Sequence, residues 1–187
     1  KPIYVTQPFL PPLKDNVKRE NIEGVEPSQY APEEFVIYKD IKDIKDKKYD
    51  VITMVNTLEH IYNPTEMLQD IWNILEDDGH FYVHVPDIYN RTINYSMDKF
   101  LSCAHLYNFS VKTLQKLLLK CGFEPTCVFP ITEEMGDKVC ILAKKAKPCK
   151  FFEQETNYCS LLTKMFLEEA NSVYITRESL TSEGKSV

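Results

Sequence analysis

A nearly continuous apolar run, YDVITMVN from Tyr49 to Asn56, constrains the fold of this chain more than any other feature. A strand that is apolar on both sides must be covered on both faces, as happens at the centre of a parallel sheet. The chain has 187 residues, 43% of them hydrophobic, so it can bury one sizeable core. We therefore expect a single α/β domain with a central strand at residues 49–56.

A capped helix and a second strand follow this run. Asn63 can cap a helix with Pro64 at the first position and Glu66 at the third, and apolar residues then recur at helical spacing. Asp77–Gly79 is expected to stop the helix, and HFYVHVP at residues 80–86 is expected to be the next strand. A strand, a helix and a strand within about forty residues favour a right-handed parallel crossover.

The same alternation extends in both directions along the chain. We expect two strands upstream, then a helix and two strands downstream, at residues 22–26, 35–38, 110–122, 126–131 and 139–143. The short turn between the last two strands predicts an antiparallel hairpin. The predicted sheet is therefore mostly parallel, with one reversed strand at its edge.

Charge, apolar runs and cysteine spacing exclude several classes of protein. The net charge is −6, with acids and bases mixed along the chain, which disfavours a nucleic-acid partner. No apolar run approaches the roughly 20 residues that span a bilayer, and the N-terminus has no signal-peptide pattern. The six cysteines form no C-x-x-C pair. We expect a soluble cytoplasmic protein with reduced cysteines and without a membrane partner.

Three stretches resemble class I S-adenosylmethionine-dependent methyltransferases that act on small molecules. They are YDVITMVNTLEHIYNP at 49–64, ILEDDGHFYVHVPD at 74–87 and AHLYNFSVKTLQKLLLKCGF at 104–123. The resemblance covers residues 21–146. It implies a Rossmann-like methyltransferase fold that closes with an antiparallel C-terminal hairpin, with S-adenosylmethionine as the cofactor.

The resemblance also implies which residues hold the cofactor. An acidic residue after the second strand binds the ribose hydroxyls in that family, an acidic residue after the third strand lies near the adenine, and the fourth strand ends at the methionine part. The matching residues are Glu26 with Pro27, Asp40 with Ile41, and Asn56, Thr57 and Leu58. A carboxylate can accept two hydrogen bonds from adjacent hydroxyls. The ordinary alternative is that Glu26 and Asp40 are solvated surface carboxylates.

The substrate side of the site is expected to begin at Glu59 and His60. His60 can act as a general base, or it can fix the turn by hydrogen bonding, and His105 is a second candidate with the same alternatives. His80 and His84 share one face of a strand but lie about 13 Å apart. No metal site is predicted.

The N-terminal residues depart from the family pattern. Such domains open with a strand and a glycine-rich loop, but residues 1–20 contain no glycine and are rich in proline. Three explanations stay open, in this order: residues are lost between Glu20 and Asn21; Ile3 to Thr6 supplies a substitute first strand; or the domain binds no cofactor. The opening KPIYVTQPFLPPL resembles nucleotide-sugar aminotransferases, which suggests a context in sugar or polysaccharide synthesis.

These features lead to one predicted organisation and function. We expect an atypical segment at 1–20, where the first part of the domain is incomplete or replaced, an α/β domain at 21–146, and a C-terminal helix with a flexible tail at 147–187. The predicted activity is methyl transfer from S-adenosylmethionine to a small molecule, with a sugar as one candidate acceptor. The alternative is a non-catalytic interaction module. The apolar stripe at 161–167 suggests a homodimer through the C-terminal helix.

Overall fold

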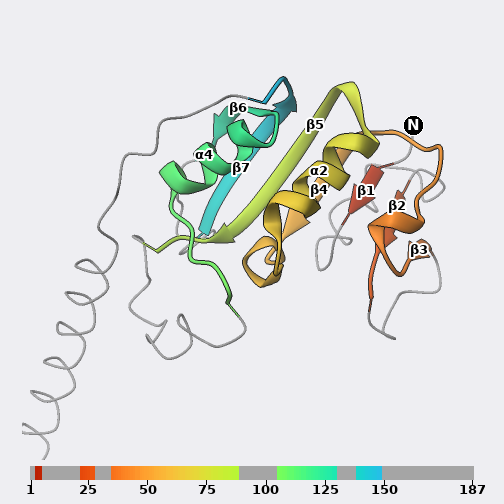
Figure 1. Ribbon diagram of the computed structural model, residues 1–187, viewed down its shortest axis with the longest axis horizontal. Coiled ribbons are helices and arrows are strands. Elements are labelled where there is room, and N and C mark those ends of the chain that lie inside the picture. Colours follow the sequence, from red (N-terminus) through yellow and green to blue (C-terminus); the bar gives the residue numbers. More distant parts are fainter. Residues whose placement is uncertain (1–2, 6–21, 28–34, 89–104, 130–137, 149–187) are drawn as a thin grey trace, which may run out of the picture. The chain divides into compact units, whose positions relative to one another are not determined.

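The computed structural model describes residues 3–5, 22–27, 35–88, 105–129 and 138–148, all of which belong to one compact unit. Its centre is a seven-stranded sheet in the order β3-β2-β1-β4-β5-β7-β6 (Figure 1). The strands are β1 Ile3–Val5, β2 Ile22–Val25, β3 Val36–Tyr38, β4 Tyr49–Val55, β5 Leu75–Pro86, β6 Phe123–Val128 and β7 Lys138–Lys145. The helices are α2 Pro64–Ile74 and α4 Val111–Lys120, with 3-10 turns η2 Ile41–Asp43 and η3 Leu58–His60.

Strand β1 lies between β2 and β4 and is parallel to both. Its first residue, Ile3, pairs with Ile22 on one side and Val51 on the other. The second of the three explanations for the unusual N-terminus predicted such a strand. The sheet therefore includes residues N-terminal to the predicted domain boundary at residue 20. Residues 6–21, where a glycine-rich loop would be expected, lie outside the described residues.

Helix α2 begins as predicted but ends earlier. The Asn63 side chain accepts a hydrogen bond from the Glu66 backbone N–H, and Pro64 is the first helical residue. The helix ends at Ile74, and β5 starts at once with Leu75, so the predicted stop at 77–79 and the predicted strand start at residue 80 are wrong. Leu75 is fully buried and pairs with Tyr49. This burial extends the strand through a sequence whose acids suggested a turn.

The C-terminal hairpin is antiparallel, as predicted, but its position in the sheet differs from the prediction. Strand β7 pairs antiparallel with β5 on one side and with β6 on the other. The reversed strand is therefore inside the sheet, and β6 forms the edge. Pro125 lies in β6, where the register shifts before Cys127. Proline lacks an amide donor and is tolerated on an edge strand at such a shift.

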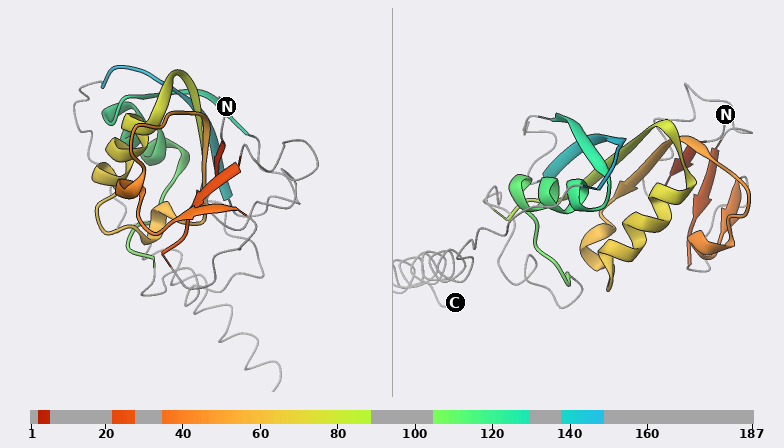
Figure 2. Two further views of the ribbon diagram at one scale, coloured as in Figure 1. Left: turned by 90° about the vertical axis from the view of Figure 1, so that its right-hand side faces the viewer. Right: turned by 45° about the horizontal axis from the view of Figure 1, so that its top comes forward.

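Both helices cover the same face of the sheet (Figures 1 and 2). Leu68 and Ile71 of α2 and Leu114 and Leu118 of α4 are fully buried and belong to one hydrophobic cluster with the strands. The described helices are not long and apolar enough to cross a membrane. The predicted C-terminal helix and its dimer contact fall beyond residue 148, outside the described residues.

Candidate active site

The carboxyl ends of parallel strands β2, β3 and β4 bring the predicted cofactor residues to one edge of the sheet. Glu26 follows β2, and its backbone N–H donates to the Tyr38 carbonyl at 2.9 Å, which extends the pairing with β3 by one residue. Glu26 is half-buried and Pro27 is exposed. In parallel sheets this edge is where ligands bind.

Asn56 ends β4 with the unusual backbone φ of 47°. Its N–H donates to the His84 carbonyl at 2.8 Å, so the turn starts directly from the sheet. The Thr57 hydroxyl donates to the Val55 carbonyl at 2.9 Å. Leu58 is fully buried in the core, so its side chain does not face the edge of the sheet where a ligand would bind. A left-handed non-glycine residue is uncommon and often marks a functional turn.

Asp40 and Ile41 line a pocket of about 270 Å³ together with residues from the start of α2. The other lining residues are Lys42, Ile61, Tyr62, Asn63, Glu66, Met67 and Asp70. The Asp40 side chain also caps η2 by accepting from the Lys42 N–H at 2.9 Å. Asp40 therefore has a structural task besides the predicted contact with the cofactor. Burial raises the pKa of Asp70, another lining residue.

His60 and His105 meet although 45 positions separate them in the sequence. Their ring centroids are 4.8 Å apart, with the rings edge to face at 63°. The Tyr107 N–H donates to the Glu59 carbonyl at 3.2 Å, and the Tyr107 hydroxyl donates to the Tyr62 carbonyl at 3.0 Å. These two bonds hold residues 105–107 beside η3. The structure thus brings together both predicted substrate-side histidines.

Glu59 was expected to face the substrate, but only 1% of the residue is exposed. Burial raises the pKa of its carboxyl, and the nearby His60 opposes this effect. Its Oε1 lies 3.8 Å from His60 Nε2. The "LEH" sequence places the carboxylate beside the imidazole, but no periodic pattern predicts that a turn glutamate is buried. The sequence therefore could not reveal this group.

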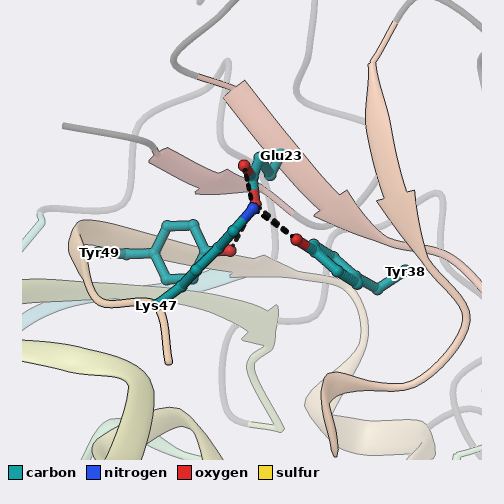
Figure 3. A network of polar contacts seen from close by, with 4 residues as sticks. All are labelled: Glu23, Tyr38, Lys47 and Tyr49. Atoms are coloured by element: carbon teal, nitrogen blue, oxygen red, sulfur yellow. Dashed lines mark hydrogen bonds and ion pairs between the residues drawn. The ribbon is translucent and has the colours of Figure 1, made fainter. Parts of the chain in front are cut away.

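A second polar cluster, which the sequence analysis missed, surrounds Glu23 in β2 (Figure 3). Lys47 Nζ donates to Glu23 Oε1 at 2.8 Å and to the Tyr38 hydroxyl at 2.7 Å, and the Tyr49 hydroxyl donates to Glu23 Oε2 at 2.7 Å. Burial acts to raise the pKa of Glu23, but hydrogen bonds from Lys47, Tyr49 and Tyr38 outweigh it and hold that pKa below 4.5. Lys47 and Tyr49 lie before and at the start of β4. The cluster stabilises the sheet.

The fold is that of class I methyltransferases, as solved structures show. An S-adenosylmethionine-dependent methyltransferase from Thermotoga maritima is 22% identical, with a TM-score of 0.57 over 77% of this chain and 81% of that chain. The 1,6-didemethyltoxoflavin-N1-methyltransferase of Burkholderia thailandensis, solved with bound S-adenosylhomocysteine, is 16% identical, with a TM-score of 0.59 over 78% and 71%. A Clostridium acetobutylicum S-adenosylmethionine-dependent methyltransferase is 14% identical, with a TM-score of 0.56 over 78% and 84%.

Residues 6–128 match the family described as methyltransferase domain, so the chain belongs to that family. None of the curated proteins matches the sequence. The predicted Rossmann-like fold and the predicted enzyme class, a methyltransferase, are confirmed by this match and by the structural neighbours. S-adenosylmethionine, the cofactor predicted from the sequence, is the cofactor that agrees with this family and fold.

Proposed function

We propose that this chain transfers a methyl group from S-adenosylmethionine to an oxygen, nitrogen or carbon of a small molecule bound beside His60 and His105. One observation carries the proposal. The parallel strands β2, β3 and β4 bring Glu26, the Asp40–Ile41 pocket and the Asn56 turn to a single edge of the sheet, and His60, which contacts His105, follows that turn.

The described residues fit the ribose and the adenine of the cofactor. Glu26 offers a half-buried carboxylate, which can accept hydrogen bonds from both ribose hydroxyls. The pocket beside Asp40 and Ile41 has room for an adenine ring, with apolar side chains from Ile41, Ile61 and Met67 in its lining. We therefore assign ribose binding to Glu26 and adenine binding to this pocket.

In methyl transfer, the main task of the protein is to position the two reactants. The bound sulfonium supplies a methyl group that is already electrophilic, so the chain must hold the acceptor in line and exclude water. A proton that leaves an acceptor hydroxyl or amine needs a base within reach. His60, whose side chain is 40% exposed, is our candidate for that base, and His105 would orient it.

The surface beside the histidines suits an amphipathic acceptor. Tyr62 is 88% exposed, Leu106 51% and Tyr107 39%, and all three lie within two residues of His60 or His105. Exposed tyrosine rings combine an apolar face with a polar rim. A sugar derivative is the finer proposal for the acceptor, and it is supported by this surface and by the N-terminal resemblance noted above.

A transfer assay tests the proposal. The chain is incubated with S-adenosylmethionine that carries an isotopically labelled methyl group and with pools of sugar derivatives, phenols and amines, and products are found by mass spectrometry. We expect one labelled product together with S-adenosylhomocysteine. Glu26→Ala should lower kcat/KM for the cofactor by about 10-fold or more, since it removes hydrogen bonds to a charged group. The exposed Glu124 in β6 provides the control Glu124→Ala. Equal turnover by Glu26→Ala and the parent chain would contradict the assigned ribose site.

A further inference from the structure

Glu59, His60 and His105 form a compact group of metal-binding side chains. One carboxylate oxygen and one nitrogen from each imidazole lie within 4.8 Å of one another. In a tetrahedral zinc site with bonds of about 2.1 Å, neighbouring ligand atoms lie roughly 3.4 Å apart. The ligand atoms of the three residues are thus slightly farther apart than in an occupied zinc site. Modest side-chain rotations would bring them to the distances of such a site.

The backbone holds this group in place from two directions. Glu59 and His60 share the turn η3, which begins directly after β4 and the Asn56 residue. The Tyr107 N–H binds the Glu59 carbonyl at 3.2 Å and so fixes the segment that carries His105. The fold therefore fixes the backbone positions of the three residues.

Among the described residues, one oxygen of the buried Glu59 carboxylate lacks a hydrogen-bond partner. Within the described part of the chain, its Oε2 is buried and has no hydrogen-bond partner. Its Oε1 is 3.8 Å from His60 Nε2, which is too long for a hydrogen bond. Buried charges in proteins are paired or coordinate metal ions. An ion between Glu59 and the two histidines would give this oxygen a partner.

We propose that Glu59, His60 and His105 bind a divalent transition-metal ion such as Zn²⁺. Two imidazole nitrogens and one carboxylate oxygen suit Zn²⁺ and its first-row neighbours, whereas Mg²⁺ and Ca²⁺ prefer oxygen ligands alone. Three protein ligands leave at least one position open for another molecule. The sequence predicts no metal site here, because 45 positions separate His60 from His105 and only the fold brings them together.

The role of the ion rests on the proposed function. The cluster directly follows the Asn56 turn, where the methyl group of the cofactor is expected, so the open position is the place for the acceptor. A metal-bound hydroxyl loses its proton more easily than a free one, here to solvent water, and its oxygen would then take the methyl group as S-adenosylhomocysteine leaves. The acceptor class would then be a molecule with a hydroxyl, and the two histidines would orient it as ligands of the ion in place of acting as bases.

Metal titration of the full chain tests this site without reference to turnover. The chain is freed of metal with a chelator, separated from the chelator and titrated with Co²⁺, whose visible absorption reports nitrogen and oxygen coordination. We expect saturable binding of one ion, displaced by Zn²⁺. His60→Asn and His105→Asn should each weaken it about 10-fold or more, because loss of even an outer partner of a metal site costs 10–100-fold. His80→Asn is the matched control, since His80 lies in β5 outside the cluster.

Two further measurements separate the possible failures. Glu59→Gln keeps the side-chain shape and removes the charge, so it should also weaken Co²⁺ binding, and circular dichroism checks that it folds. An absence of saturable Co²⁺ binding would overturn the metal site. Equal Co²⁺ affinity in the parent chain and in the His60 and His105 variants would also overturn it, and the group would then be only a contact between histidine and glutamate. S-adenosylmethionine binding measured with chelator present tests the proposed function separately, because the cofactor residues do not include the cluster.

Discussion

Asn56 ends strand β4 in a backbone conformation that few side chains adopt. Its φ of 47° lies in the left-handed region, which costs most residues about 1–2 kcal/mol and asparagine less. We predict that Asn56→Ala lowers the free energy of unfolding by about 1 kcal/mol, while Asn56→Gly changes it by less than about half that, since glycine adopts this conformation freely. Urea denaturation of the two variants measures the difference. Equal stability would show that the turn has no such backbone requirement.

Glu23 makes stability depend on pH at the residue scale. Its pKa in the folded chain is below the ordinary value of 4.5, so its contribution is present above that pH and is lost as the pH falls through the lower folded value. Lys47→Met removes the cation and should lower the unfolding free energy at neutral pH by about 1 kcal/mol, because the Lys47 side chain is 41% exposed and solvent screens the pair. Without Lys47 the pKa of Glu23 in the folded chain should rise, so the loss of stability on acidification should occur at a higher pH.

The matched control for this prediction is Lys45→Met, which removes the same charge from an exposed residue two positions away. Thermal unfolding between pH 3 and pH 7 compares the two variants with the parent chain. Identical pH profiles for Lys45→Met and Lys47→Met would mean that net charge, and not the contact with Glu23, sets the acid stability.

At the scale of elements, Gly122 and Trp72 join α4, α2 and the end of β7. Trp72 Nε1 donates to the Gly122 and Ala146 carbonyls at 3.1 Å each. Gly122 has a φ of 86°, and a Cβ atom there would lie 2.9 Å from Trp72 Nε1. Gly122→Ala should therefore lower the unfolding free energy by about 1–3 kcal/mol through strain and crowding. Lys116→Ala on the exposed side of α4 is the control, and equal melting temperatures would contradict the account.

Elements with local signals were predictable from the sequence, and those fixed by distant contacts were not. The caps at Asn63 and Ser110 mark the starts of both helices, and each accepts a backbone hydrogen bond as expected. Leu75 was expected in the helix, and Asp77–Gly79 was expected to stop it. Strand β5 instead begins at Leu75, which is buried and pairs with Tyr49, and the Leu75 carbonyl accepts a hydrogen bond from Lys145 Nζ at 2.8 Å, 70 positions away. The place of β7 inside the sheet depends on pairing with β5, which no local pattern encodes.

At the scale of the whole molecule, the resemblance identified the fold and the edge of the site, but it could not reveal the chemistry between distant residues. Glu26, Asp40 and Asn56 follow parallel strands, so topology alone places them on one edge. The meeting of His60 with His105, and the burial of Glu59 beneath them, require the bonds of Tyr107 to residues 59–62. Both segments resemble the same family, but neither stretch encodes the contact between them.

Cofactor binding is the central claim, and calorimetric titration of this chain with S-adenosylmethionine tests it most directly. We predict micromolar affinity, weakened about 10-fold or more by Glu26→Ala, because the ribose would lose hydrogen bonds to a charged acceptor. Glu124→Ala should leave the affinity unchanged. An absence of binding heat in a sample that circular dichroism shows to be folded would contradict the account, and so would equal affinity in the Glu26→Ala variant.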